Sequence, residues 1–152
     1  MQNLTALAHI TFLFPFQSTF FGREDQALSG FSEFFKKRSG EERDHAMALM
    51  QYQSMRGGRV VFQEVAKPAQ TEWSSALEAV ETALELEKAI NSALLELHKV
   101  ADARGDPQFC DFLEGNYLKE QVEDIKELAD LVTRLRRAGE GLGVHLIDRE
   151  LI

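Results

Sequence analysis

Positions spaced by alternating steps of four and three run from residue 31 to residue 52, which is the spacing of the buried face of an amphipathic helix. The members of this stripe are Phe31, Phe35, Arg38, Glu42, His45, Leu49 and Tyr52. The stripe predicts a helix that begins near Glu24 or Ser29 and ends at Arg56. Gly57 and Gly58 follow, and glycine after the last helical turn is a common C-terminal stop.

Two later segments show the same periodicity. One predicts a helix over about 75–103, with the stripe Ala76, Val80, Ala83, Glu87, Ile90, Leu94 and Leu97. The other is expected to begin at Asp106 and Pro107, an N-cap followed by a first-turn proline, and to reach about residue 137. Its stripe is Leu118, Gln121, Ile125, Leu128, Val132 and Leu135. A loop over about 59–74 and a short last segment over 144–152 complete one predicted all-α domain, residues 1–152.

The first 22 residues give an ambiguous pattern. Apolar residues alternate with period two from Leu4 to Phe16, which is a strand signal, but Leu7 and Phe14 also fit a helical stripe. Pro15 would kink a helix interior. We interpret residues 1–22 as an atypical first helix that packing against the other helices keeps helical. The segment lacks the basic start of a signal peptide and is too polar for a membrane span.

Composition narrows the class of protein. The 152 residues include 44% hydrophobic and 28% charged residues, which is ordinary for a globular domain. The net charge of -8 argues against a nucleic-acid partner and is compatible with attracting cations. Cys110 is the only cysteine of the sequence, so no internal disulfide can form, which favours a reducing compartment.

Polar residues interrupt each of the three predicted stripes. Glu42 and His45 lie one turn apart in the first, Glu87 lies in the second and Gln121 in the third. A buried carboxylate is costly unless a partner compensates its charge, and a metal cation is one such partner. Carboxylate, imidazole and amide ligands suit iron or manganese better than a soft metal. The spacing alone leaves two alternatives: a metal site, or a buried network of hydrogen bonds and salt bridges.

Several ordered stretches of this sequence resemble the ferritin family. They are Arg23-Glu24-Asp25-Gln26-Ala27-Leu28, Glu41-Glu42-Arg43-Asp44-His45-Ala46, Arg56-Gly57-Gly58-Arg59, Leu86-Glu87-Lys88, Leu94-Leu95-Glu96-Leu97-His98-Lys99, Cys110-Asp111-Phe112-Leu113-Glu114, Tyr117-Leu118-Lys119-Glu120-Gln121-Val122 and Gly143-Val144-His145-Leu146-Ile147-Asp148. The resemblance covers about residues 18–152. The ending Leu135-Arg136-Arg137, with its short glycine-rich connection, is similar to plant and algal ferritins.

The resemblance implies a four-helix bundle with a long crossover loop and a short fifth C-terminal helix. It implies an iron-storage subunit of a hollow shell with octahedral symmetry, built from identical or mixed subunits. Fe(II) would enter at three-fold channels, be oxidised by dioxygen at a di-iron centre, and be stored as ferric mineral. By matching position, Glu42 would bridge the two irons, His45 and Glu87 would each bind one, and Gln121 would help hold the oxidant or its water.

Four further carboxylates take roles from the resemblance. Asp111 and Glu114 would line the three-fold channel. Glu41 and Asp44 resemble carboxylates that nucleate mineral on the cavity side, although Met47 stands where a third partner is usual. A solvated acidic face is the alternative for Glu41 and Asp44.

The N-terminal segment departs from the family pattern. Counting back without a gap places Leu7 where the first helix of the family supplies a glutamate ligand, and no Asp or Glu precedes Glu24. Phe14 stands where a tyrosine is usual. Three hypotheses follow: a ferroxidase centre that lacks one ligand, a shell subunit without enzymatic activity, or a chain that does not assemble. We expect a cytoplasmic protein, with a plastid as the alternative although no transit peptide is recognisable in this sequence.

Overall fold

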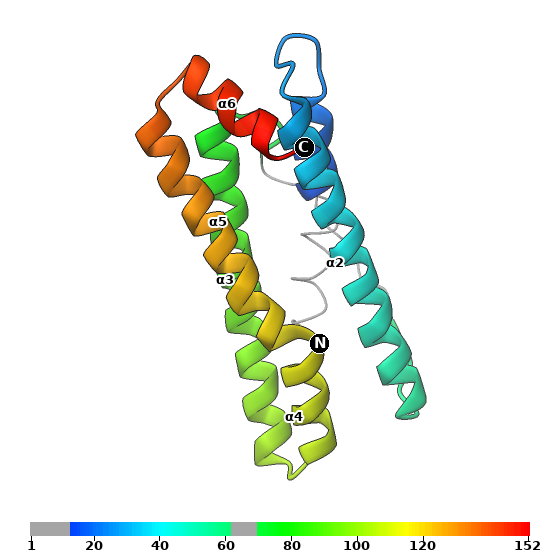
Figure 1. Cartoon of the computed structure of the whole chain (residues 1–152). Helices are drawn as coiled ribbons and strands as arrows, with labels where there is room; N and C mark the ends of the chain where they lie inside the picture. Colours follow the sequence, from blue (N-terminus) through cyan, green and yellow to red (C-terminus); the bar gives the residue numbers. More distant parts are fainter. Residues whose placement is uncertain (1–12, 62–69) are drawn as a thin grey trace.

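The computed structural model of the chain describes residues 13–61 and 70–152. Within this part the chain is helical and contains no strand, which confirms the all-α prediction. The helices are residues 13–21, α2 (Ser29–Met55), α3 (Ala76–Ala103), α4 (Pro107–Leu113), the π-helical turn η1 (Glu114–Leu118), α5 (Lys119–Ala138) and α6 (Leu142–Glu150). α3 and α5 run side by side, and α4 continues the line of α5 toward the far end of α3 (Figure 1).

The C-terminus of α2 forms as the glycine pair predicts. The Gly57 N–H donates to the Ser54 carbonyl at 3.0 Å and the Gly58 N–H donates to the Gln53 carbonyl at 2.9 Å. Gly57 has a φ of 78°, a left-handed conformation that favours glycine. These two bonds satisfy carbonyls of the last turn that have no partner inside the helix.

The third predicted helix is interrupted by a π-helical turn. The sequence pattern predicted one regular helix from Asp106 to about residue 137, whereas η1 separates α4 from α5. The predicted start is confirmed, because the Asp106 carboxylate accepts a hydrogen bond from the Phe109 N–H at 3.1 Å and Pro107 occupies the first turn. A π turn adds one residue without ending a helix and leaves no simple mark in the apolar periodicity.

The last helix packs across the beginning of α2 (Figure 1). Gly30 allows this approach, because a Cβ at that position would lie 1.8 Å from the backbone oxygen of Asp148. Asp148 itself is buried and accepts a hydrogen bond from the Phe31 N–H at 2.9 Å. The predicted short C-terminal helix is therefore confirmed, and it is attached to an element more than a hundred residues earlier in the chain.

The described part of the N-terminal segment supports the helical interpretation. Residues 13–21 are helical, and Phe14 and Phe21 are fully buried. The ring of Phe21 stacks on that of Phe35 with centroids 5.7 Å apart, and Phe14 stacks on the same ring at 5.9 Å. The Gln17 side chain donates to the Ala79 carbonyl at 2.8 Å. Leu7 and most of the residues that alternate with period two lie outside the described residues.

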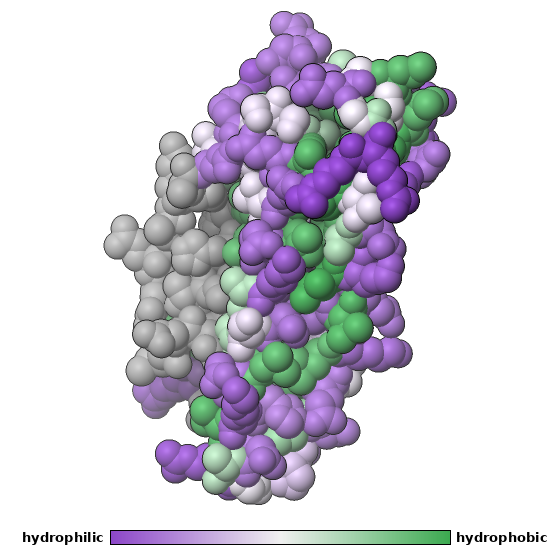
Figure 2. All heavy atoms as spheres, turned by 90° about the vertical axis from the view of Figure 1, so that its left-hand side faces the viewer, coloured by the Kyte–Doolittle hydropathy of each residue, from purple (hydrophilic) through white to green (hydrophobic). Residues whose placement is uncertain are grey.

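The outer surface over α3, α5 and α6 is mixed in polarity. Figure 2 shows hydrophilic and apolar side chains interspersed on the face that lies on the left in Figure 1. Exposed large apolar residues on these three helices are Leu95, Val100, Val122, Leu142 and Leu146. None of the helices in the described part of the chain is both long and apolar enough to cross a membrane.

Candidate metal centre

Three long helices bring buried polar side chains to one place. Glu42 comes from α2, Glu87 from α3 and Gln121 from α5, and their exposed fractions are 3%, 0% and 4%. The Gln121 side-chain N–H donates to Glu87 Oε2 at 2.8 Å. The structure therefore confirms that three of the four polar interruptions, Glu42, Glu87 and Gln121, are buried, and it joins two of them directly. The fourth, His45, is partly buried, with 18% of its side chain exposed.

Glu87 lies in an environment that disfavours its charge. Burial, and then the nearby negative charge of Glu42, raise the pKa of Glu87 to about 7, against the hydrogen bond from Gln121 and the charge of Arg38. Two carboxylates that repel one another in a buried space are a common setting for a cation. A metal ion between Glu42 and Glu87 would relieve this repulsion.

His45 lies between two carboxylates. Its Nδ1 is 3.1 Å from Glu42 Oε1, and its Nε2 is 3.0 Å from Glu120 Oε2. The hydrogen bond with Glu42, with further contributions from Glu120, raises the pKa of His45 to about 9. The imidazole is therefore protonated on both ring nitrogens at neutral pH in this arrangement. Binding a metal through one of these nitrogens would release its proton.

Three buried oxygen atoms at this place have no hydrogen-bond partner among the described residues. They are Glu42 Oε2, Glu87 Oε1 and Gln121 Oε1. Buried acceptor atoms are rarely left without a partner. Three of them in one place point to a bound cation, because a cation can take electron pairs from all three oxygen atoms. Hard oxygen atoms beside one imidazole nitrogen are a donor set that iron accepts.

The described side chains do not form a complete metal cage. Within residues 13–61 and 70–152, no three His, Cys, Asp or Glu side chains are arranged so that they could hold one metal ion. Glu42 and His45 face each other and Glu87 faces Gln121, so part of the donor set is engaged in these two pairs. Leu7, which counting back without a gap places at the position of the family's first-helix glutamate, lies outside the described residues.

Tyr117 supports the position of His45. Its hydroxyl donates to the His45 carbonyl at 2.9 Å, and the two ring centroids are 5.5 Å apart. Burial, followed by the charge of Glu42, raises the pKa of Tyr117 to about 12, so the hydroxyl keeps its proton and remains a donor. Tyr117 belongs to the π turn, which thus presents a side chain to the candidate centre.

The two candidate nucleation residues differ in their surroundings. Glu41 is partly buried, pairs with Lys37 at 3.4 Å and borders a pocket beside the candidate centre. Asp44 is exposed. Neither side chain forms a hydrogen bond with Glu42 or Glu87 in the described part of the chain, so their roles stay predictions.

The two candidate channel residues lie near the start of the third long helix. Asp111 is exposed on α4, and Glu114 begins η1. Glu114 Oε1 is 2.6 Å from Nε2 of His98 on α3, and Cys110 is half-buried. A channel at a three-fold axis requires other subunits, so this role too stays a prediction.

Sequence reasoning missed the acidic residues around the centre. Glu120 contacts His45, and Asp124 and Glu127 pair with the buried Arg38. Their numbers differ by four and three, so they share one face of α5 next to its apolar stripe. Arg38 was in the predicted stripe of α2, and an arginine at a buried position was the available signal that acidic partners would face it.

Comparison with known proteins identifies the class to which this fold and this set of buried ligand-type side chains belong. The family model described as "Ferritin-like domain" matches residues 16–138. The chain is 53% identical over 144 residues to a ferritin heavy chain of Echinococcus granulosus, covering 95% of this chain and 83% of that protein. It is 51% identical over 133 residues to soma ferritin of Lymnaea stagnalis, covering 88% and 76%.

A third relative is the ferritin middle subunit of Aquarana catesbeiana. The two sequences are 48% identical over an alignment of 155 positions, which covers 100% of this chain and 87% of the relative. The chain belongs to the ferritin family. The expected ferritin-like fold is thereby confirmed.

Proposed function

We propose that this chain is an iron-storage subunit that takes up Fe(II), oxidises it with dioxygen at the Glu42–Glu87–Gln121 site, and retains the ferric product inside a shell of many subunits. The observation that carries the proposal is the group of three buried oxygen atoms, Glu42 Oε2, Glu87 Oε1 and Gln121 Oε1, which have no partner among the described residues. Membership of the ferritin family supports the same activity.

Each side chain would have a distinct role. Glu42 would bridge two iron ions, because it lies near both His45 and Glu87. His45 would bind one ion after losing its proton, and Glu87 would bind the other. Gln121 holds Glu87 through its N–H and would present its oxygen toward the oxidant or its water. Each Fe(II) would give one electron to dioxygen, and carboxylate ligands favour the ferric product that results.

Storage requires assembly, and we propose an octahedral shell of identical or mixed subunits. The exposed apolar residues on α3, α5 and α6, such as Leu95, Val122 and Leu146, would be covered by neighbouring subunits. Asp111 and Glu114 would line the three-fold entry for Fe(II), and Glu41 and Asp44 would hold iron at the start of mineral growth.

The test is the rate of Fe(II) loss in air at low iron loading, with oxygen consumption measured in parallel. Three assembled proteins are compared: the wild type, Glu42→Ala, and Glu33→Ala as a matched control on an exposed part of α2. We expect Glu42→Ala to slow the reaction about tenfold or more, because removing a group that holds reacting ions costs this much or more. Equal rates for the wild type and Glu42→Ala would refute the enzymatic part of the proposal.

A second candidate function is a shell subunit that stores iron without oxidising it. One sequence observation favours it: no Asp or Glu of this sequence precedes Glu24, and counting back without a gap places Leu7 where the first helix of the family supplies a glutamate. Leu7→Glu separates the two candidates. A large gain in oxidation rate from a near-zero start indicates the passive subunit, whereas a modest gain over a measurable rate indicates a weakened but active centre.

Gel filtration of the purified chain tests assembly independently of chemistry. A peak at the size of many subunits supports both storage proposals. A peak at the size of one chain, 17.2 kDa, would refute both.

A further inference from the structure

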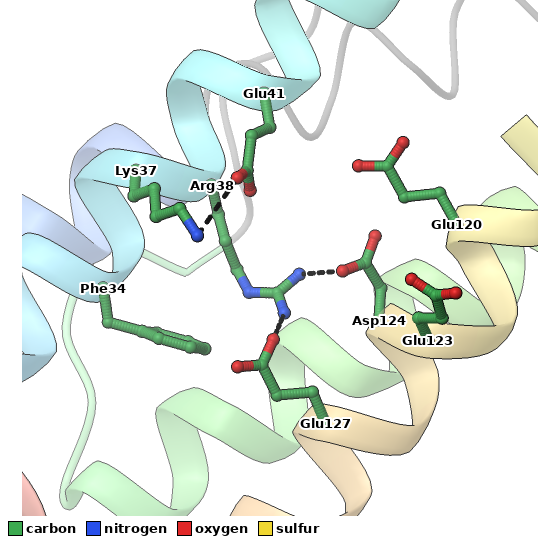
Figure 3. Close-up of a pocket in the computed structure, with 8 residues that line it drawn as sticks. All are labelled: Phe34, Lys37, Arg38, Glu41, Glu120, Glu123, Asp124 and Glu127. Atoms are coloured by element: carbon green, nitrogen blue, oxygen red, sulfur yellow. Dashed lines mark hydrogen bonds and ion pairs between the residues drawn. The ribbon is translucent and has the colours of Figure 1, made fainter. Parts of the chain in front are cut away.

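An acidic pocket of about 280 Å³ lies between α2 and α5, beside the candidate centre (Figure 3). Its lining includes five carboxylates: Glu41, Glu120, Glu123, Asp124 and Glu127. Two cationic side chains, Lys37 and Arg38, face them. The carboxylates therefore outnumber the cations, and the pocket is strongly negative.

The two cationic side chains of this pocket differ sharply. The Lys37 side chain is 79% exposed and, among the described residues, pairs only with Glu41. The Arg38 side chain is 5% exposed, donates to Asp124 Oδ1 at 3.0 Å and also pairs with Glu127. Figure 3 shows its guanidinium extending from α2 toward the carboxylates of α5. Arg38 also lies over the Phe34 ring, 5.0 Å from its centroid, so its position is fixed on two sides.

The pocket is electrostatically continuous with the candidate centre. Arg38 precedes Glu42 by one helical turn on the buried face of α2. Burial raises the pKa of Asp124, and the charges of Glu120 and Glu42 add to that rise although Arg38 opposes it. The charge of Arg38 likewise lowers the pKa of Glu87, whereas the charge of Asp124 raises it. A cation in this pocket therefore interacts electrostatically with both buried carboxylates of the centre, Glu42 and Glu87.

We propose that Arg38 is the resident cation of this pocket and that it withholds Asp124 and Glu127 from divalent metal ions. The inference deepens the proposed function, because it concerns which carboxylates beside the iron centre are open to metal. The pocket already holds a cation, and that cation is a side chain of the chain itself. Arg38 thus limits the number of metal ions that this region of each subunit binds.

Physical chemistry favours this role over that of an ordinary surface pair. A guanidinium stays protonated at all physiological pH values, so proton loss cannot free the carboxylates. Its fork of N–H donors engages two carboxylates at once, which a metal ion would have to displace. Because the side chains of Arg38 and Asp124 are only 5% and 17% exposed, moving Arg38 away would leave the Asp124 carboxylate without its partner. A divalent ion placed beside it would be repelled.

The test is the stoichiometry of Co(II) binding to the assembled protein, measured by calorimetric titration and by equilibrium dialysis. We expect Arg38→Gln, which removes the charge and keeps much of the shape, to bind one additional Co(II) per subunit. Lys37→Gln is the matched control and should leave the count unchanged, because Lys37 is exposed. In Arg38→Gln combined with Asp124→Asn, the additional ion should be lost again.

Two outcomes of this comparison would overturn the proposal. Arg38→Gln could fold and assemble without any gain of Co(II), which would make Arg38 only a link between α2 and α5. Lys37→Gln could raise the count as much as Arg38→Gln, which would make the effect one of general charge.

Asp124→Asn in the otherwise wild-type protein tests the same proposal without relying on the folding of Arg38→Gln. If Arg38 withholds Asp124, this variant should bind as much Co(II) as the wild type. A lower count would show that Asp124 binds metal despite Arg38 and would overturn the inference. Glu42→Ala keeps the two proposals apart: it should lose Co(II) from the centre if the proposed function is right, and retain the additional ion when combined with Arg38→Gln.

Discussion

The Asp148 carboxylate accepts a hydrogen bond from the backbone N–H of Phe31, with Oδ1 and N 2.9 Å apart. Phe31 is in the first turn of α2, and the residue before that helix, Leu28, gives no side-chain cap. Asp148 therefore does for α2 what an N-cap side chain normally does from within the same helix. The last helix of the chain thereby completes the start of the helix that carries Glu42 and His45.

Replacing Asp148 tests this tertiary cap. Asp148→Ala removes the acceptor, and we expect a loss of about 0.5–2 kcal/mol in the free energy of unfolding, the usual effect of losing a cap. Hydrogen exchange at the Phe31 N–H and along α6 should accelerate together. Asp148→Asn keeps an acceptor oxygen and should lose less. Asp130→Ala, on an exposed part of α5, is the control. Unchanged exchange at Phe31 in Asp148→Ala would contradict the prediction.

Gly30 offers a second test of the same contact. A Cβ at Gly30 would lie 1.8 Å from the Asp148 backbone oxygen, so Gly30→Ala must displace α6 or α2. We expect a destabilisation of about 1–3 kcal/mol, as for overpacking of a core. Gly40→Ala in the same helix is the matched control, because its Cβ would have nothing within 4 Å. That control should be neutral or stabilise by up to about 1 kcal/mol. The measurement is the melting temperature of both variants. Equal values for Gly30→Ala and Gly40→Ala would refute the close approach of Gly30 to Asp148.

The stability of the chelator-treated protein should fall as the pH rises. Glu87 has a pKa of about 7 in the folded chain against 4.5 ordinarily, and His45 has about 9 against 6.5. Both groups bind protons more strongly in the folded than in the unfolded state, so the free energy of unfolding decreases with pH. The destabilisation from Glu87 develops between pH 4.5 and 7. The stabilisation from His45 is complete below pH 6.5 and is lost toward pH 9.

Melting temperatures across this pH range, compared between the wild type and two variants, check the prediction. The difference between the wild type and Glu87→Gln should change mainly below pH 7, and that between the wild type and His45→Gln mainly above pH 6.5. Difference curves that do not vary with pH would contradict it.

Glu87→Gln should separate stability from metal binding. The variant removes a buried charge that Glu42 repels, while its amide oxygen can still accept from Gln121. At pH 8 with a chelator present, we expect a gain of about 1–3 kcal/mol in the free energy of unfolding, since one pKa unit corresponds to about 1.4 kcal/mol. Metal affinity should fall in the same variant. Glu85→Gln, two residues away on the exposed side of the same helix, is the control for both measurements. A Glu87→Gln protein less stable than the wild type would contradict the prediction, because it would show that neighbouring groups already compensate the charge of Glu87.

The number and order of the long helices could be read from the sequence because each buries one apolar stripe, and that burial leaves a period of about 3.6 residues. The stops at Gly57 and the start at Asp106 were readable because both depend on local backbone chemistry. The π turn at Glu114–Leu118 was not, since it changes helix register without changing which kinds of residue are buried.

The sequence by itself determined the helical stripes and the polar residues that interrupt them, because periodicity and local capping depend on neighbours in the chain. It placed Glu42, Glu87 and Gln121 in buried faces, and the structure bears this out. Only the tertiary structure decided the partners: His45 with Glu120, Arg38 with Asp124, and Phe31 with Asp148. These pairs join residues more than seventy positions apart in the sequence, and such residues come into contact only when the helices pack against one another.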